Sequence, residues 1–329
     1  MFTRHTSRGG KPTASRTRRT AAILVATLAA VGALAAKADA DPTAAHSAHD
    51  HGVGDNAEQS AAIRAQQAVP AALRGSEFRA DCTSKGRSGD DPIVKPGQPG
   101  ASHIHEFSGN TTTNAYSTLQ SLRLGGTTCE PRSDLSAYWT PTLYKNGVPV
   151  APERVTVYYQ GIFEKAGAVT PPQGLRIVVG NALATSPAQN PAARWSCVGH
   201  PQSSADFLNC PPGSKLETYL DFPTCWDGVN VDSPDHKSHV QFIIGGVGGH
   251  CPPGYPKMLP RTEFLITYPV NGGGLSLAGT RNGANVTNAP GYTFHGDWIN
   301  AWEPNEFERR MNTCIRAGYV CGTNGNPIG

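Results

Sequence analysis

The sequence predicts a mainly β protein: a single sandwich or jelly-roll-like domain with long loops, disulfides and one C-terminal helix. Three observations support this fold class. Runs of β-branched and aromatic residues recur along the chain, as is typical of strands. The 37 glycines and 27 prolines are frequent between these runs, where they favour turns. The eight cysteines are an even number, which favours disulfides in an exported protein.

Four segments are the strongest strand candidates. Each is rich in β-branched or aromatic residues and is bounded by turn residues; they span residues 154–163, 175–179, 239–244 and 263–270. We expect residues 76–329 to form one domain, because single β domains of this size are common.

One helix is predicted, over residues 304–317. Phe307, Met311, Cys314 and Ile315 recur at helical spacing and would share one apolar face. Gly318 follows as a stop signal.

The cysteines leave their pairing open, because eight of them allow 105 combinations. Short separations favour Cys314–Cys321 and Cys197–Cys210, and the simplest complete set adds Cys82–Cys129 and Cys225–Cys251. A zinc–thiolate site is the alternative, but the sequence contains no C-x-x-C pair.

The first 40 residues are typical of a secretory signal peptide. A basic segment ends at Arg19, residues 21–36 form an apolar run, and Ala38-Asp39-Ala40 fits a cleavage site. A retained membrane anchor is the alternative, but the run is shorter than the roughly 20 residues that a span needs. We therefore expect a secreted, extracellular protein with no membrane segment after cleavage.

Cleavage of the signal peptide would change the sign of the net charge, which is +3 for the full chain. The chain has 28 basic and 25 acidic side chains, and residues 1–40 hold seven of the basic and one of the acidic ones. The remainder has 21 basic and 24 acidic side chains, a net charge of −3. We therefore expect no nucleic-acid partner.

Residues 41–75 are rich in alanine, glutamine and small polar residues, which predicts a flexible leader with one short helix near residues 61–68. Its three histidines, His46, His49 and His51, are interpreted as part of a solvated tail.

Five histidines of the β domain fall in compact polar motifs. His103 and His105 flank one residue, and residues i and i+2 of a strand point to the same face. His236 and His239 form an H-x-x-H pair, which a tight turn brings together. His295 precedes an aspartate by two residues. Together they predict one shared divalent-metal site, for zinc or copper, since imidazole suits both ions.

Three aspartates near these histidines are candidate proton carriers: Asp227, Asp235 and Asp297. Carboxylates fix the tautomer of metal-bound histidines or act as general acids and bases. Two alternatives stay open: a metal-free glycosidase that uses two carboxylates, and histidines that only brace long loops.

Four aromatic residues are candidate sugar-binding side chains, because such rings stack on sugars: Tyr138, Trp139, Trp226 and Trp298. Core strand positions would explain the same residues. The sequence lacks G-x-S-x-G, H-E-x-x-H, a phosphate loop and a dinucleotide fingerprint, so it indicates no familiar reaction class.

An ordered series of motifs resembles a known family. Between about Phe78 and Cys321 the chain carries, in order, DPIV, SHIHEF, YWTPTLY, FPTCWDG, DHKSH and FHGDW. It is similar to secreted domains of unknown function from actinobacteria and filamentous fungi, some of which carry WSC or lectin modules. The resemblance implies an extracellular setting and an association with cell wall or polysaccharide. The family's histidine motifs match at His103, His105, His236, His239 and His295.

We therefore expect an extracellular domain with a His/Asp site that binds a metal and acts on or binds polysaccharide or cell-wall material. The alternative is a non-catalytic wall-binding or metal-sequestering protein whose histidines are partly structural. Whether the protein is an enzyme stays open.

Overall fold

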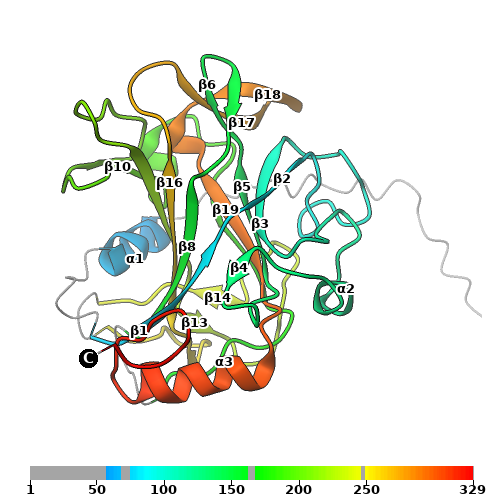
Figure 1. Ribbon diagram of the computed structural model, residues 1–329, viewed down its shortest axis with the longest axis vertical. Coiled ribbons are helices and arrows are strands. Elements are labelled where there is room, and N and C mark those ends of the chain that lie inside the picture. The colour runs from blue at the N-terminus through cyan, green and yellow to red at the C-terminus, as the bar shows by residue number, and fades with distance from the viewer. Residues whose placement is uncertain (1–56, 68–74, 162–166, 246–248, 329) are drawn as a thin grey trace, which may run out of the picture. The chain divides into compact units, whose positions relative to one another are not determined.

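A seven-stranded and a five-stranded antiparallel sheet pack against each other (Figure 1), and the mainly β prediction is confirmed. The computed structural model describes residues 57–67, 75–161, 167–245 and 249–328, which all belong to one compact unit, His46–Gly329. The predicted signal peptide lies outside the described residues, as does most of the predicted leader.

The seven-stranded sheet has the order β11-β10-β12-β16-β8-β1-β4. Its strands are β1 (Glu77–Cys82), β4 (Cys129–Glu130), β8 (Arg154–Gln160), β10 (Arg194–Cys197), β11 (Ser203–Ser204), β12 (Leu216–Asp221) and β16 (Arg261–Tyr268). Alternation positions its side chains: in β1, Phe78, Ala80 and Cys82 are buried, whereas the residues between them are partly exposed.

The five-stranded sheet has the order β2-β3-β5-β19-β9. Its strands are β2 (Ser84–Ser88), β3 (His105–Gly109), β5 (Ala137–Pro141), β9 (Arg176–Gly180) and β19 (His295–Ile299). Every residue of β3, β5 and β19 is buried, so both faces of this sheet are covered.

The part of the chain that the structure describes contains two further, smaller sheets. One is four-stranded, with β6 (Leu143–Lys145), β7 (Val148–Val150), β17 (Leu275–Arg281) and β18 (Ala284–Ala289). The other is three-stranded, with β13 (Cys225–Trp226), β14 (Val240–Gln241) and β15 (Lys257–Met258). Of the four predicted strand segments, three correspond to β8, β9 and β16; the fourth, residues 239–244, forms only the two-residue strand β14.

The main core lies between the two large sheets. Tyr138 of β5 meets Phe264 of β16 edge to face, with ring centroids 5.4 Å apart. Tyr159 of β8 meets Trp298 of β19 in the same way at 6.0 Å. Such aromatic pairs contribute about 0.5–1.5 kcal/mol beyond the apolar area that they bury.

A second, smaller core covers the other face of the five-stranded sheet. Phe107 of β3 stacks on Trp139 of β5 at 5.6 Å, and Ile93 and Val178 are buried beside them. Because alternate residues of a strand face opposite ways, β3, β5 and β19 each contribute side chains to both cores.

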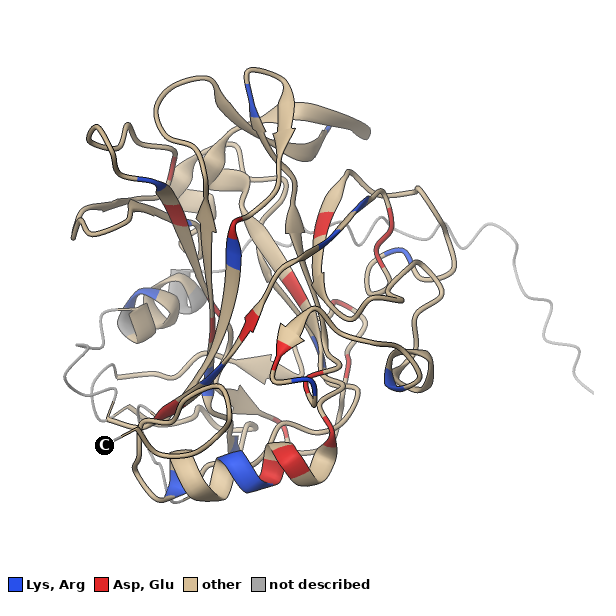
Figure 2. Ribbon diagram, in the orientation of Figure 1, with Lys and Arg blue, Asp and Glu red and all other residues tan. Residues whose placement is uncertain are grey.

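Within the described residues, three α-helices, two 3-10 turns and a π-helical turn lie outside the sheets. They are α1 (Ala57–Gln67), α2 (Leu119–Arg123), η2 (Pro187–Gln189), η3 (Gly291–Thr293), α3 (Pro304–Arg310) and η4 (Met311–Arg316). The predicted C-terminal helix is therefore observed as α3 followed by η4, with its predicted apolar face buried. Figure 2 shows both charge signs on α3; Glu306 lies in its first turn and Arg309 and Arg310 in its last, as the helix dipole favours. Among the described residues, no helix has the length and apolar character that crossing a membrane requires.

Helix α1 falls within the predicted flexible leader but packs on the domain. Ile63 is 1 % exposed, and the Gln66 side-chain amide donates a 2.9 Å hydrogen bond to the carbonyl of Phe222. Residues 57–67 are therefore part of the folded unit.

All eight cysteines are paired, and the simplest predicted pairing is confirmed: Cys82–Cys129, Cys197–Cys210, Cys225–Cys251 and Cys314–Cys321. A zinc–thiolate site is excluded, because disulfide sulfurs are not thiolate ligands.

Candidate metal centre

Strand register brings two distant histidines onto one face of the five-stranded sheet. His105 of β3 pairs with Pro141 of β5. On the other side of β5, β19 is antiparallel to it, and Asp297 pairs with Trp139. Extending this register by two residues places His295 opposite Pro141. Residues opposite each other in an antiparallel pair point to the same face, so His105 and His295 flank Pro141 on the face of the smaller core.

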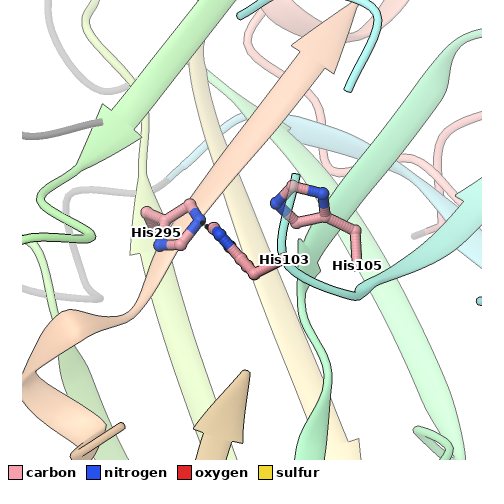
Figure 3. A group of neighbouring side chains, drawn as sticks. All are labelled: His103, His105 and His295. Carbon is pink, nitrogen blue, oxygen red and sulfur yellow. Dashed lines mark hydrogen bonds between the residues drawn. The ribbon is translucent and has the colours of Figure 1, made fainter. Parts of the chain in front are cut away.

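His103, just before β3, completes a cluster of three imidazoles with His105 and His295, which we call the histidine cluster (Figure 3). One ring nitrogen from each lies within 4.8 Å of the others, and all three side chains are buried. The Nε2 atoms of His103 and His295 are 3.0 Å apart.

Backbone carbonyls fix the tautomers of two of these rings. Nδ1 of His105 lies 3.0 Å from the carbonyl oxygen of Asp90, and Nδ1 of His295 lies 2.9 Å from that of Thr293. A carbonyl only accepts, so each Nδ1 carries the proton and each Nε2 carries the lone pair. Metal-binding histidines usually have this arrangement, with the outer N–H held by a carbonyl or carboxylate.

The tautomer of the third ring, His103, follows from the tautomer of His295. Because Nε2 of His295 is an acceptor, a metal-free His103 donates its own Nε2–H across the 3.0 Å contact. Its Nδ1 then faces the hydroxyl of Thr280 at 3.4 Å. A metal ion bound at the cluster would replace this shared proton, as metals do at imidazole sites.

The spacing is close to what one ion needs. Two nitrogens bonded to zinc at about 2.1 Å are about 3.4 Å apart in tetrahedral geometry and about 3.0 Å apart at a right angle. The His103–His295 contact is already at the lower value. The widest pair, at no more than 4.8 Å, would need to close by at most about 1.4 Å.

A buried carboxyl lies on the same strand face as the cluster. Asp297 is two residues after His295 in β19 and is 0 % exposed. Burial raises the pKa of the Asp297 carboxyl well above its ordinary value, the charge of Asp91 raises it further, and the charge of Lys237 lowers it. Burial in the metal-free protein therefore favours the neutral form of the Asp297 carboxyl.

A family model described as a domain of unknown function (DUF1996) matches residues 91–302. The chain belongs to the DUF1996 family. The match includes all three residues of the histidine cluster. Strand β1, between β8 and β4 in the seven-stranded sheet, and helix α3 lie outside it. No curated protein and no solved structure matches the chain.

The other two predicted metal ligands of this DUF1996 domain, His236 and His239, hydrogen-bond to groups outside the histidine cluster. His239 uses both ring nitrogens: Nε2 donates to the carbonyl of Arg176 at 2.7 Å, and Nδ1 lies 2.8 Å from the hydroxyl of Ser233. Nδ1 of His236 contacts Asp232 at 2.8 Å. These contacts brace a loop against β9, and neither residue joins the histidine cluster.

Two of the predicted proton carriers cap turns. Asp227 accepts the backbone N–H groups of Val229 and Asn230, which outweigh the effect of burial and lower its pKa. Asp235 accepts those of Lys237 and Ser238 with the same result for its pKa. A catalytic role for Asp227, Asp235 and Asp297 stays a prediction.

The predicted sugar-binding aromatics lie mostly in the core. Tyr138, Trp139 and Trp298 are each 1 % exposed, so none presents a ring face to a ligand. Trp226 is partly exposed, and its indole N–H donates to the carbonyl of Asn230. Alternating strand positions explain the three buried rings, and a groove lined by these four aromatics is not formed.

A surface cavity of about 370 Å³ adjoins the histidine cluster, and we call it the hairpin cavity. The β17–β18 hairpin, residues 182–185 and residues 290–293 contribute its walls. Two of its lining residues contact the cluster: the hydroxyl of Thr280 faces His103, and the carbonyl of Thr293 accepts from His295. Thr280 is brought there by the packing of segments that are distant in the sequence, so no local pattern predicts its position, whereas Thr293 lies only two residues before His295.

Proposed function

We propose that this DUF1996 protein is an extracellular metal-binding protein that holds one zinc or copper ion at His103, His105 and His295 and acts on or binds polysaccharide or cell-wall material. The observation that carries the proposal is the approach of three ring nitrogens to within 4.8 Å, with the outer nitrogens of two rings held by carbonyls. Three imidazoles are a sufficient protein ligand set for catalytic zinc.

The extracellular setting is supported by the four disulfides. Such bonds form and persist in oxidising compartments and are rare in the cytosol. The predicted signal peptide and the resemblance to wall-associated proteins agree with it.

A bound ion would supply Lewis acidity and a water of lowered pKa. The residues of the chain would orient it: the carbonyls of Asp90 and Thr293 hold the two imidazoles, and Thr280 lies behind the third. Asp297 lies two residues after His295 on the same face of β19, so it is the best candidate for a proton carrier.

A second candidate function is metal binding without catalysis. The specific observation in its favour is that the three imidazoles are at most 1 % exposed and do not themselves line the hairpin cavity. A ligand in that cavity would contact Thr280 and Thr293 rather than the ion. Turnover assays on wall polysaccharides separate the two functions once the metal is established.

The decisive experiment is the metal content of secreted, untagged protein, measured by mass spectrometry. His46, His49 and His51 are replaced by alanine throughout, to remove the leader histidines. We expect about one zinc or copper per chain, lost in His103→Ala and in His295→Ala.

His236→Ala is the matched control, because it removes a histidine that lies outside the cluster, and it should keep the ion. Protein that stays metal-free after incubation with both ions would rule out the metal centre. Equal loss in the control would instead restore the larger five-histidine site.

A further inference from the structure

The charge that lines the hairpin cavity is positive only. Of the described residues that line it, Arg281 is the single charged side chain, and the others are apolar or uncharged polar residues. A cavity of this composition attracts anionic groups, because no lining carboxylate neutralises the guanidinium. Its volume of about 370 Å³ lies at the small end of the range for small-molecule sites, so it suits one compact group.

Arg281 is available to a ligand. Its side chain is exposed and, within the described part of the chain, makes no hydrogen bond or ion pair with another side chain. Most other arginines around the five-stranded sheet are engaged: Arg87 pairs with Glu106 and Arg176 with Asp232. A guanidinium binds a carboxylate with two parallel hydrogen bonds, which gives geometric selectivity as well as charge.

The hairpin holds Arg281 in place over the cavity. Arg281 pairs with Ala284, and the two residues between them, Asn282 and Gly283, have φ angles of 52° and 77°. Two consecutive positive φ angles form the tight two-residue turn that matches strand twist. A preformed tip lowers the ordering cost of binding.

The remaining lining is typical of a sugar site. Tyr292 contributes a partly exposed ring, Asn282 an exposed amide and Thr280 a hydroxyl. Aromatic faces combined with a few directed polar groups suit the faces and hydroxyls of a pyranose.

We propose that the hairpin cavity binds an acidic sugar residue of a polysaccharide, with Arg281 pairing to the uronate carboxylate. This rests on the proposed polysaccharide partner but not on the metal. The cavity would then hold a sugar residue of the polysaccharide next to the histidine cluster, because Thr280 and Thr293 line the cavity and also contact His103 and His295.

The test is calorimetric titration of the full secreted chain with trigalacturonate and with its methyl ester, in which each charged carboxylate is replaced by a neutral ester. We expect trigalacturonate to bind at least ten-fold more tightly than the ester. Arg281→Gln should weaken trigalacturonate binding at least ten-fold, and Arg281→Lys should weaken it less. Arg154→Gln, which removes an exposed arginine outside the cavity, should leave it unchanged.

The inference would be overturned by equal binding of the ester, by no effect of Arg281→Gln, or by inorganic phosphate competing as well as the sugar, which would mean a simple anion site. Absence of any trigalacturonate binding would do the same. The titration is repeated with chelator-treated protein and with His295→Ala. Sugar binding that persists in both separates this inference from the metal proposal, and metal binding without sugar binding leaves the metal proposal standing alone.

Discussion

Nε2 of His103 and Nε2 of His295 lie 3.0 Å apart, although 192 residues separate them in the chain. Two neutral imidazoles reach this distance by sharing one proton, and two metal-bound imidazoles reach it by sharing one ion. Both states fit the same backbone, because β3 and β19 are held on either side of β5. The contact therefore connects metal binding, protonation and stability.

Zinc should stabilise the folded protein through this contact. An ion that binds only the native state at 100 times its Kd adds about 2.7 kcal/mol to the free energy of unfolding. For a domain of this size that corresponds to a rise in Tm of roughly 5–10 °C. Thermal unfolding with and without zinc measures it.

His103→Ala should abolish the zinc-dependent rise, whereas His236→Ala should keep it. A rise of equal size in both variants would mean that the ion binds elsewhere.

His239 should behave as a brace rather than a ligand. Its alanine variant leaves the carbonyl of Arg176 without its 2.7 Å donor, and losing a partly buried hydrogen bond costs about 1–3 kcal/mol. We expect denaturant unfolding to show that loss while the metal content per folded chain stays unchanged. Loss of the metal together with the stability would assign His239 to the centre.

The buried group of Asp221, Arg261 and Glu263 should make stability depend on pH. Nε of Arg261 donates to Asp221 at 2.7 Å, and its Nη2 also contacts Glu263. Burial and then the charge of Asp221 raise the pKa of Glu263 to about 7, although Arg261 opposes them. Burial alone would raise the pKa of Asp221, but the charges of Arg261 and Arg194 hold it below its ordinary value.

The signs of the two contributions differ. Folded protein keeps the Glu263 proton up to pH about 7, whereas an unfolded glutamate releases it near 4.5, so this contribution is full below pH 4.5 and is lost as pH rises to 7. The contribution of Asp221 is present above about pH 3.8 and is lost as pH falls further. Glu263→Gln should flatten the stability profile between pH 4.5 and 7, with Glu130→Gln as the control for loss of an exposed carboxylate. A slope that survives Glu263→Gln would assign it to other groups.

Sequence patterns predicted the parts of the fold and site that depend on local spacing. The two-residue spacing of His103 and His105 predicted that their rings lie together, and the ring centroids are 4.3 Å apart although His103 lies just before β3. Strands β8, β9 and β16 follow runs of β-branched residues. The role of His295 was predicted from its motif, but its distance from His103 depends on which strands flank β5, and no local pattern encodes that order. His236 and His239 have the residue types of ligands and yet hydrogen-bond to a loop, because brace and ligand histidines look alike in sequence.

The composition of residues 41–75 predicted a flexible leader, whereas Ile63 and Gln66 attach α1 to the domain. Ile63 is buried and should therefore matter for stability. Ile63→Ala should lower the free energy of unfolding by about 2–4 kcal/mol, as for other buried aliphatic side chains. Arg64→Ala, at the exposed neighbouring position, should change it by less than about 0.5 kcal/mol. Urea unfolding of both variants checks this, and equal small effects would mean that α1 does not pack on the domain in solution.

Gly180 allows β9 to approach β19 next to the histidine cluster. It has a φ of 93°, and a Cβ there would lie 2.6 Å from the carbonyl oxygen of Phe294 and 2.8 Å from Cα of His295. Gly180→Ala should therefore cost both backbone strain and a shift of β19, about 2–4 kcal/mol in all, and should lower metal affinity. Gly147→Ala isolates the strain, since Gly147 has a φ of 77° and open space around its Cβ position. If the two variants lose equal stability and keep equal metal affinity, the close approach at His295 does not position the centre; a larger loss of both in Gly180→Ala means that the spacing of β9 and β19 sets the geometry of the histidine cluster.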